Sequence, residues 1–151
     1  WYCGGGNYKI KASSSLGDSY KAEFANDLSY KTAWVEGKKD EGIGEYLEYY
    51  FKNNSPRITE IIISNGYIKS EETWKNNNRV KKLKLYVNGV PFGILNLKDS
   101  RTDQYFEVGT LGHNKNGTDL ILKFEILEIY KGSKYNDTAI TEIYFDGIDV
   151  H

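Results

Sequence analysis

The chain has 151 residues, a length that predicts one domain. Its 20 basic and 21 acidic residues give a formal net charge of -1, which argues against a nucleic-acid partner because such binders carry a basic excess. No apolar run approaches the roughly 18 residues that span a bilayer, so the sequence predicts no direct membrane insertion.

The first residues, WYCGGG, do not include an initiator Met, which predicts a processed or excised segment. Adjacent glycines hold ordered structure poorly, so we expect a flexible leader or linker over residues 1–8 and a single domain over residues 9–151. A lipoprotein-anchor remnant and the edge of a metal-binding ribbon remain open, although Tyr2 fits a lipid-modification site poorly. Cys3 is the single cysteine, which excludes an internal disulfide.

Alternating apolar and polar residues predict strands along the middle of the chain. EYLEYYF (45–51) and LKLYV (83–87) each place their apolar side chains on one face, as a half-buried strand does. RITEIIIS (57–64) is largely apolar and β-branched, which predicts a central strand. Asn88 and Gly89 both tolerate positive φ, so we expect a tight hairpin turn there, with Pro91 at a strand start or an edge.

The strongest strand pattern is DLILKFEILEIY (119–130), where the apolar phase changes at Ile126 and Leu127. A β-bulge at that point would keep both halves facing the core. Its Leu, Glu and Lys content also permits a helix, but the β-branched residues and the alternation favour a strand. With AITEIYF (139–145) the chain offers roughly eight strands and no convincing long helix. The predicted fold class is all-β: an antiparallel two-sheet β-sandwich, or jelly roll.

Residues suited to catalysis are scarce. The two histidines are His113, in the polar stretch LGHNKNGTD, and the last residue, His151. Carboxylates gather at Glu36, Asp40, Glu41, Glu45 and Glu48. We interpret these acids as surface residues, because carboxylates are mostly exposed and nothing in the sequence fixes a catalytic pair. The sequence therefore predicts that the protein is not an enzyme.

Several segments together resemble a known family. ASSSL, the stretch NDLSYKTAW, and AITEI near the C-terminus resemble the discoidin-like, galactose-binding-like jelly-roll superfamily. A more specific resemblance is carried by four further stretches: TAWVEG…GIGEY, NGYIKS…W…N.R.KKLKLYVNG, Asp99 with Gln104 and Phe106, and IYKGSKYNDTAITEI. They resemble the glycan-binding domain found beside bacterial secreted NAD-glycohydrolases, over about residues 10–147.

The resemblance implies a non-catalytic carbohydrate-binding module whose partner is a glycan or oligosaccharide. It also implies tethering to other domains of a larger bacterial protein that is secreted or membrane-anchored, and hence an extracellular or cell-surface location. The NAD-cleaving activity belongs to a different domain. On the residues alone, two other functions remain open: a protein-interaction or spacer domain of an exported toxin or cell-surface assembly, and a small hydrolase.

The resemblance further implies a structural Ca²⁺ site. In related modules, an Asp five residues before a Thr and a Glu near the C-terminus hold the ion, and the matching residues here are Asp27, Thr32 and Glu142. Ser29 stands at the place of a second acidic or amide ligand, and Leu28 replaces the usual Gly, which should weaken the site. The alternative is that Asp27 and Thr32 cap a turn and Glu142 is exposed.

Candidate glycan contacts lie in two stretches. The first stretch, residues 64–85, offers Tyr67, Lys69, Trp74, Asn76, Asn78 and Arg79. The second stretch, residues 127–145, offers Tyr130, Lys134, Tyr135, Asn136 and Asp137. Aromatic rings beside amides and charges, in loops on a rigid β scaffold, are typical of a ligand pocket.

We expect residues 65–79 to form a long ordered loop in which Trp74 is the sugar platform. The alternative is that the motif only pins this loop, with Lys69 or Arg79 paired to Asp137. Trp34, by contrast, is predicted to lie in the core, because Trp is usually buried and follows a turn here.

Overall fold

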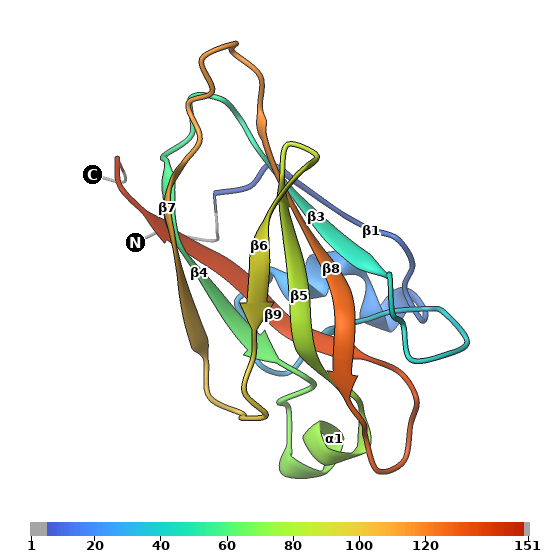
Figure 1. Ribbon diagram of the computed structural model, residues 1–151. Helices are drawn as coiled ribbons and strands as arrows, with labels where there is room; N and C mark the ends of the chain where they lie inside the picture. Colours follow the sequence, from blue (N-terminus) through green and yellow to red (C-terminus); the bar gives the residue numbers. More distant parts are fainter. Residues whose placement is uncertain (1–5, 150–151) are drawn as a thin grey trace.

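The computed structural model of the protein describes residues 6–149, so Cys3, His151 and most of the predicted leader lie outside the described residues. Two antiparallel sheets pack face to face (Figure 1). The five-stranded sheet has the order β1-β3-β8-β5-β6, with β1 (Lys9–Ala12), β3 (Tyr46–Phe51), β5 (Arg79–Val87), β6 (Val90–Asn96) and β8 (Leu120–Tyr130). The four-stranded sheet has the order β2-β9-β4-β7, with β2 (Trp34–Val35), β4 (Ile58–Asn65), β7 (Gln104–Leu111) and β9 (Ala139–Gly147). The predicted two-sheet β-sandwich is confirmed.

Helices are short in the described part of the chain. Two 3-10 helices, η2 (Asp18–Tyr20) and η3 (Ala22–Ala25), lie between β1 and β2, and α1 (Glu71–Asn76) lies between β4 and β5. None of the helices in residues 6–149 is both long and apolar enough to cross a membrane.

The core lies between the sheets and follows the predicted alternation. Every second residue of β3 is buried, and the first seven residues of β8 alternate in the same way. Phe145 of β9 packs edge-on against Tyr49 and Phe51 of the opposite sheet, with ring centroids 5.2 and 5.0 Å apart. Trp34 is fully buried, as predicted.

The predicted β-bulge in β8 is also present. Lys82 pairs with Glu128 while its neighbour Leu83 pairs with Ile126, so Leu127 is the extra residue of the bulge. The bulge shifts the strand by one residue, which explains the change of apolar phase in the sequence.

Three further predictions about strands and turns are confirmed. Asn88 and Gly89 have φ values of 51° and 81° and form the turn between β5 and β6. Pro91 lies in β6, which is an edge strand. The apolar run 57–64 became β4, which lies between β9 and β7 and is therefore central in its sheet.

The tract between β4 and β5 differs from the predicted loop because it contains α1. Ser70 begins this helix: its hydroxyl accepts the N–H of Thr73 at 3.1 Å, and its own N–H donates to the Thr73 hydroxyl at 3.0 Å. This reciprocal capping box satisfies backbone donors that a helix start leaves unpaired. Six residues are too few to show an apolar helical period, so pattern alone did not reveal the helix.

A single buried side chain, Asn65, joins the two sheets at the base of this tract. Asn65 is fully buried at the end of β4, and Val80 is fully buried near the start of β5. The Asn65 amide donates from Nδ2 to the carbonyl oxygen of Val80 at 2.7 Å, and its Oδ1 accepts the N–H of Val80 at 2.8 Å. The side chain thus replaces a neighbouring strand for one residue of β5 and closes the excursion of the chain through α1.

We predict that Asn65→Ala lowers the free energy of unfolding by about 2–4 kcal/mol, because it leaves both backbone groups of Val80 buried without partners. Urea denaturation measures this change. Asn54→Ala is the matched control, since Asn54 is exposed in the β3–β4 connection and its removal should cost less than about 0.5 kcal/mol. Equal effects of the two substitutions would contradict this role for Asn65.

Candidate functional site

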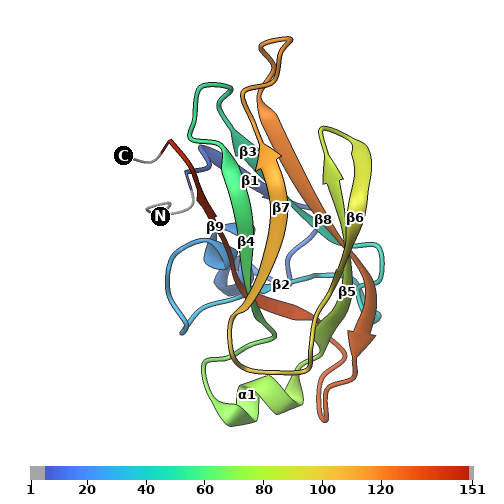
Figure 2. The same ribbon diagram turned by 60° about the vertical axis from the view of Figure 1, so that its left-hand side comes forward.

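The β4–β5 connection, which contains α1, and the β8–β9 connection meet at one end of the sandwich. The connection from β8 to β9, residues 131–138, runs beside α1 in both ribbon views (Figures 1 and 2). Backbone hydrogen bonds join the two segments: the N–H of Ser133 donates to Lys75 O and that of Tyr135 to Asn76 O, both at 2.9 Å. These bonds hold the β8–β9 connection against the C-terminal turn of the helix.

Gly132 allows this close approach. A Cβ at position 132 would lie 2.4 Å from the carbonyl oxygen of Asn76 and 2.6 Å from the carbonyl carbon of Asn77, closer than atoms can pack. The N–H of Gly132 also donates to the Oδ1 of buried Asn78 at 2.7 Å. Asn78 therefore acts as an internal anchor of the loop.

Arg79 secures the last turn of α1. Its guanidinium forms a bidentate pair with Asp99 at 2.9 and 3.1 Å. The Nη1 atom donates to the carbonyl oxygens of Trp74, Lys75 and Asn77 at 3.1–3.2 Å. The alternative pairing of Arg79 with Asp137 is thus wrong, since its carboxylate partner is Asp99.

Trp74 packs against Arg79 from the other side. The guanidinium carbon lies 4.5 Å from the indole centroid, and the indole N–H donates to Asn65 O at 3.2 Å. Gly66, with φ at 76°, leaves room for this stack, because a Cβ there would lie 2.5 Å from the Arg79 side chain. One face of the predicted sugar platform is therefore occupied by the protein itself.

A pocket of about 340 Å³ lies beside these loops. It is lined by Leu16, Tyr20, Val35, Tyr67, Thr73, Asn77, Tyr135 and Asp137, which we call the α1 pocket. The rings of Tyr20 and Tyr67 meet edge to face with centroids 6.4 Å apart, while Tyr135 is 45% exposed. The pocket therefore combines fixed aromatic walls with one accessible ring.

Asp137 supplies a charged acceptor to the α1 pocket. Its backbone oxygen accepts the N–H of Asn78, but its carboxylate has no hydrogen-bond partner among residues 6–149. Partial burial raises the pKa of this carboxyl from its usual value. A ligand hydroxyl could satisfy the carboxylate without disturbing the loop.

Glu36 fixes the neighbouring loop and corrects the sequence analysis, which placed this acid on the surface. It is fully buried; Oε1 accepts the N–H of Thr138 at 3.1 Å and Oε2 accepts that of Lys38 at 2.8 Å. Burial raises the pKa of Glu36 to about 6, although these two N–H groups oppose the shift. Gly42 crosses directly over the side chain, where a Cβ would lie 2.5 Å from the Glu36 carboxyl carbon.

The four residues predicted to bind Ca²⁺ lie together near the end of η3 and the middle of β9. The N–H of Asp27 donates to Glu142 Oε1 at 3.1 Å, and the hydroxyl of Thr32 donates to Asp27 Oδ2. Ser29 closes a turn, since its N–H donates to Asp27 Oδ1 at 3.0 Å. Leu28, where the family pattern has Gly, adopts a left-handed φ of 58°.

Glu142 gives the main evidence that a cation would fit. Only 1% of this residue is exposed, so the alternative that it is a surface acid is wrong. Its Oε2 atom is buried and has no hydrogen-bond partner within residues 6–149. Burial, followed by the proximity of Asp27, raises the pKa of Glu142 to about 9. No group of three or more His, Cys, Asp or Glu side chains in residues 6–149 could hold a metal, so hydroxyl and backbone oxygens would have to complete this site.

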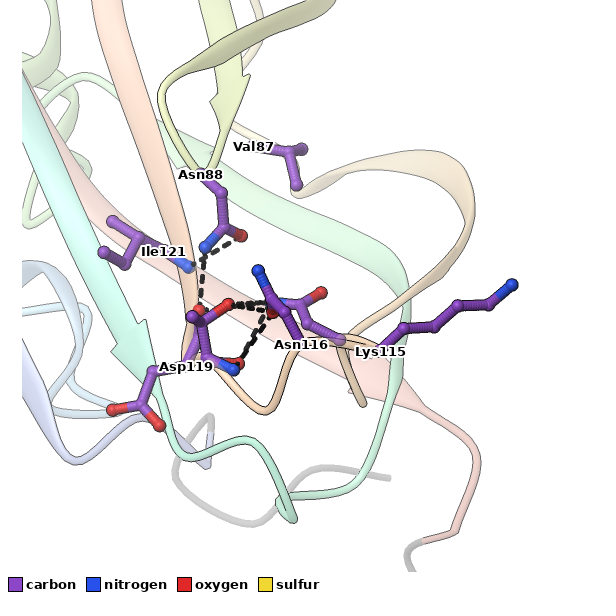
Figure 3. Close-up of a pocket in the computed structure, with 8 residues that line it drawn as sticks. Val87, Asn88, Lys115, Asn116, Asp119 and Ile121 are labelled. Carbon is purple, nitrogen blue, oxygen red and sulfur yellow. Dashed lines mark hydrogen bonds between the residues drawn. The ribbon is translucent and has the colours of Figure 1, made fainter.

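The opposite end of the sandwich holds a larger pocket of about 730 Å³, between the β5–β6 turn and the β7–β8 connection (Figure 3). Its amides mainly hold these loops together: Asn88 Nδ2 donates to Asp119 O at 2.8 Å, and Asn114 Nδ2 to Thr118 O at 3.1 Å. The Asp119 carboxylate instead accepts the Tyr8 hydroxyl at 2.7 Å. The α1 end therefore holds the candidate functional site.

A family model described as the NAD glycohydrolase translocation F5/8 type C domain matches residues 1–146. The chain belongs to this family. A comparison of this sequence with curated proteins found no match.

Solved structures show that this F5/8 type C domain shares its fold with carbohydrate-binding modules. CpGH89CBM32-5 from Clostridium perfringens, in complex with GalNAc-β-1,3-galactose, has a TM-score of 0.64 at 20% identity, covering 91% of this chain and 93% of its own. The family 32 module of C. perfringens NanJ, in complex with galactose, has a TM-score of 0.65 at 15% identity over 91% of both chains. Chitosan-binding module 1 of a Paenibacillus chitosanase/glucanase has a TM-score of 0.57 at 15% identity, covering 97% of this chain and all of its own.

The predicted glycan contacts of this F5/8 type C domain separate into three groups. Tyr67, Tyr135 and Asp137 line the α1 pocket. Asn76, Asn78, Trp74 and Arg79 hold the surrounding loops through the contacts above, and Tyr130 donates its hydroxyl to Leu97 O at 2.8 Å. Lys69, Lys134 and Asn136 are exposed. The ligand-binding role of every one of them stays a prediction.

Sequence reasoning missed several lining residues of the α1 pocket. It selected Asn76 and Asn78, but the amide that lines the pocket is Asn77, between them. The run of three asparagines was a visible signal, although only the turn of α1 decides which one faces the pocket. Tyr20 and Leu16 come from a distant segment, and no local pattern connects them to this site.

We predict that Glu142→Gln changes the pH dependence of stability in the domain freed of metal with EDTA. Because the folded pKa of Glu142 lies above its unfolded value, the unfolded chain releases a proton that the folded chain keeps. The free energy of unfolding therefore falls as the pH rises from about 4.5 towards about 9. Gln keeps the acceptor for Asp27 and cannot ionise, so the variant should lose this fall.

Urea denaturation at pH 7 and pH 9 measures the difference. We expect the wild type to lose about 2 kcal/mol more than the variant between these values. The comparison lies above the pKa of about 6 of Glu36, so that group contributes little. Parallel pH profiles for the two proteins would contradict the assignment.

Proposed function

We propose that this domain is a non-catalytic glycan-binding module that targets a larger secreted or surface-anchored bacterial protein to carbohydrate. The observation that carries the proposal is the α1 pocket, which is lined by the accessible ring of Tyr135 and by Asp137, whose carboxylate has no hydrogen-bond partner among residues 6–149. Rings bind the apolar face of a pyranose, and a carboxylate accepts its hydroxyl donors. This combination of an aromatic wall and a few polar groups is typical of small-ligand sites.

The rigid surroundings of the α1 pocket support this function. Tyr67 is held on both sides, by the ring of Tyr20 and by a hydrogen bond of 3.3 Å from its hydroxyl to Lys31 O. The backbone of Tyr135 is fixed to Asn76. Preorganised contacts reduce the entropy lost on binding, which matters for a small site.

The structural neighbours support the same chemistry. Two of them are complexes with galactose and with GalNAc-β-1,3-galactose, and the third is a chitosan-binding module. We therefore choose these as the first ligands to test. A site of this size should bind with a Kd of roughly 0.1–1 mM, so that tethering and multivalency set the effective affinity.

We also propose that Ca²⁺ stabilises the turn that carries Asp27. Asp27, Thr32 and Glu142 would hold the ion, with backbone oxygens completing its shell and the hydroxyl of Ser29 nearby. The buried Oε2 of Glu142, which has no hydrogen-bond partner in the described part of the chain, supports this proposal. When bound, the cation would supply the positive charge that lets the buried carboxyl ionise. Its role would be structural, since Asp27 and Glu142 do not line the α1 pocket.

A protein-interaction domain is the second candidate function. The family description refers to translocation, and Val90, Phe92 and Ile94 of the edge strand β6 are 64%, 49% and 45% exposed. Capture of a protein partner that free sugar does not displace would favour this candidate over glycan binding.

We predict that Tyr135→Ala and Asp137→Asn each weaken glycan binding without unfolding the domain. Loss of the ring contact should reduce affinity about three- to tenfold, and loss of the charged acceptor about five- to thirtyfold. A glycan array at high protein density, followed by calorimetric titration, measures binding. Phe92→Ala is the matched control, because it removes another half-exposed ring far from the α1 pocket.

The array decides between the two candidate functions. Binding of wild type and Phe92→Ala with loss in the two pocket variants is the expected pattern. The absence of binding to every glycan, or equal binding by all four proteins, would sink the glycan-binding proposal at this pocket.

We predict that Ca²⁺ raises the melting temperature of the wild type at pH 8 and releases protons on binding, because the ion replaces the proton of Glu142. Glu142→Gln should show neither effect. Calorimetry in two buffers of different ionisation enthalpy measures the protons released. A melting temperature that does not respond to millimolar Ca²⁺ would contradict the site.

A further inference from the structure

A second groove is lined by Ile68, the residue that follows Tyr67 in the chain. It has a volume of about 640 Å³ and is lined by Tyr30, Ile68, Arg101, Thr102, Asp103 and Tyr105, which we call the Tyr105 groove. Tyr30 and Tyr105 are 52% and 61% exposed, so their rings are accessible. Neither the α1 pocket nor the Ca²⁺ residues contribute to it, apart from the adjacency of Tyr67 and Ile68.

Next to this groove, a row of side chains crosses the three strands β7, β4 and β9. Ile62 of β4 pairs in register with Tyr105 of β7 on one side and Tyr144 of β9 on the other. Paired residues point to the same face of a sheet, so the two tyrosines flank Ile62 on the outer face of the four-stranded sheet. Ile62 is only 4% exposed, so it is covered, whereas Tyr105 beside it is 61% exposed.

Three hydroxyl groups hold the carboxylate of Asp103 in place. Oδ2 accepts the hydroxyls of Tyr30 and Tyr144, each at 2.9 Å, and Oδ1 accepts that of Ser64 at 2.5 Å. Burial, followed by the hydrogen bond to Asp103, raises the pKa of both phenols, so both stay protonated donors at neutral pH. A carboxylate accepts about four hydrogen bonds, so one position remains for a ligand donor.

Arg101 also lines the groove and supplies hydrogen-bond donors. Its Nη2 donates to Ile68 O at 3.0 Å, and the side chain forms no ion pair within residues 6–149. The guanidinium has five N–H donors, so most of them remain available. The groove thus offers two accessible rings, a fixed acceptor and a fixed cluster of donors.

We propose that the Tyr105 groove is a second saccharide site, which binds a pyranose unit between Tyr30 and Tyr105 through Asp103 and Arg101. This inference rests on the proposal that the domain binds glycans. Because Tyr67 lines one site and Ile68 the other, one oligosaccharide chain can reach both around this short segment. Joint occupation would raise the affinity for longer glycans above that for single sugars.

Backbone amide NMR of the ¹⁵N-labelled 151-residue chain tests the two sites separately. The probes are galactose, GalNAc-β-1,3-galactose and chitosan tetrasaccharide at millimolar concentrations. We expect saturable shifts at the amides of Arg101, Thr102 and Tyr105. Tyr105→Ala and Arg101→Ala should each weaken binding at this groove about three- to tenfold, while the shifts near Tyr135 persist.

The outcomes distinguish the two proposals. Shifts near Tyr135 without shifts at residues 101–105, for all three probes, overturn the second site and leave the proposed function intact. Shifts at residues 101–105 alone support the second site and overturn the α1 pocket. If neither region responds, both proposals fail. Phe92→Ala controls for the loss of an exposed ring elsewhere.

Discussion

The pair of hydrogen bonds between Asn65 and Val80 is the contact on which the α1 end of the domain depends. Asn65 ends a strand of one sheet, and Val80 lies near the start of a strand in the other. Their hydrogen bonds join the two ends of the β4–β5 connection, which contains α1, and so fix both ends of this connection on the sandwich. The remaining contacts of the tract, from the Trp74–Arg79 stack to the pairing with residues 131–138, all build upon this closure.

Aromatic residues have two different roles at this end. Trp74 is held between Arg79 and Asn65 and stabilises the tract, whereas Tyr135 presents an accessible ring. The polar residues divide in the same way. Asn78 forms hydrogen bonds within the protein through its side-chain oxygen and its backbone. The carboxylate of Asp137, by contrast, has no hydrogen-bond partner among the described residues. Residues that are rigid for structural reasons therefore surround the few that are available to a ligand.

Much of the fold could be predicted from the sequence because its causes are local. Strand alternation, the Asn88-Gly89 turn and the bulge at Leu127 each leave a signature within a few residues. The α1 helix was missed because its six residues are too few to show an apolar period, and its last turn is held by Arg79, which comes from the next strand. The burial of Glu36 was missed because a separate loop covers it.

The candidate site was only partly predictable for the same reason. Tyr67, Tyr135 and Asp137 were identified as loop aromatics and acids beside a family motif, and they line the α1 pocket. Tyr20 and Asn77 reach that pocket through the path of the chain, and the Tyr105 groove assembles residues from three separate segments. Sequence patterns report which residue types are present in loops, whereas tertiary contacts decide which of them face a ligand.

A crystal structure of the domain soaked with GalNAc-β-1,3-galactose and Ca²⁺ tests the central claim most directly. The account predicts a sugar ring packed against Tyr135 with one hydroxyl bonded to the carboxylate of Asp137, and loops that superpose on the unliganded ones. Sugar bound only at the opposite end of the sandwich, or an α1 pocket that stays empty in saturating sugar, would contradict it.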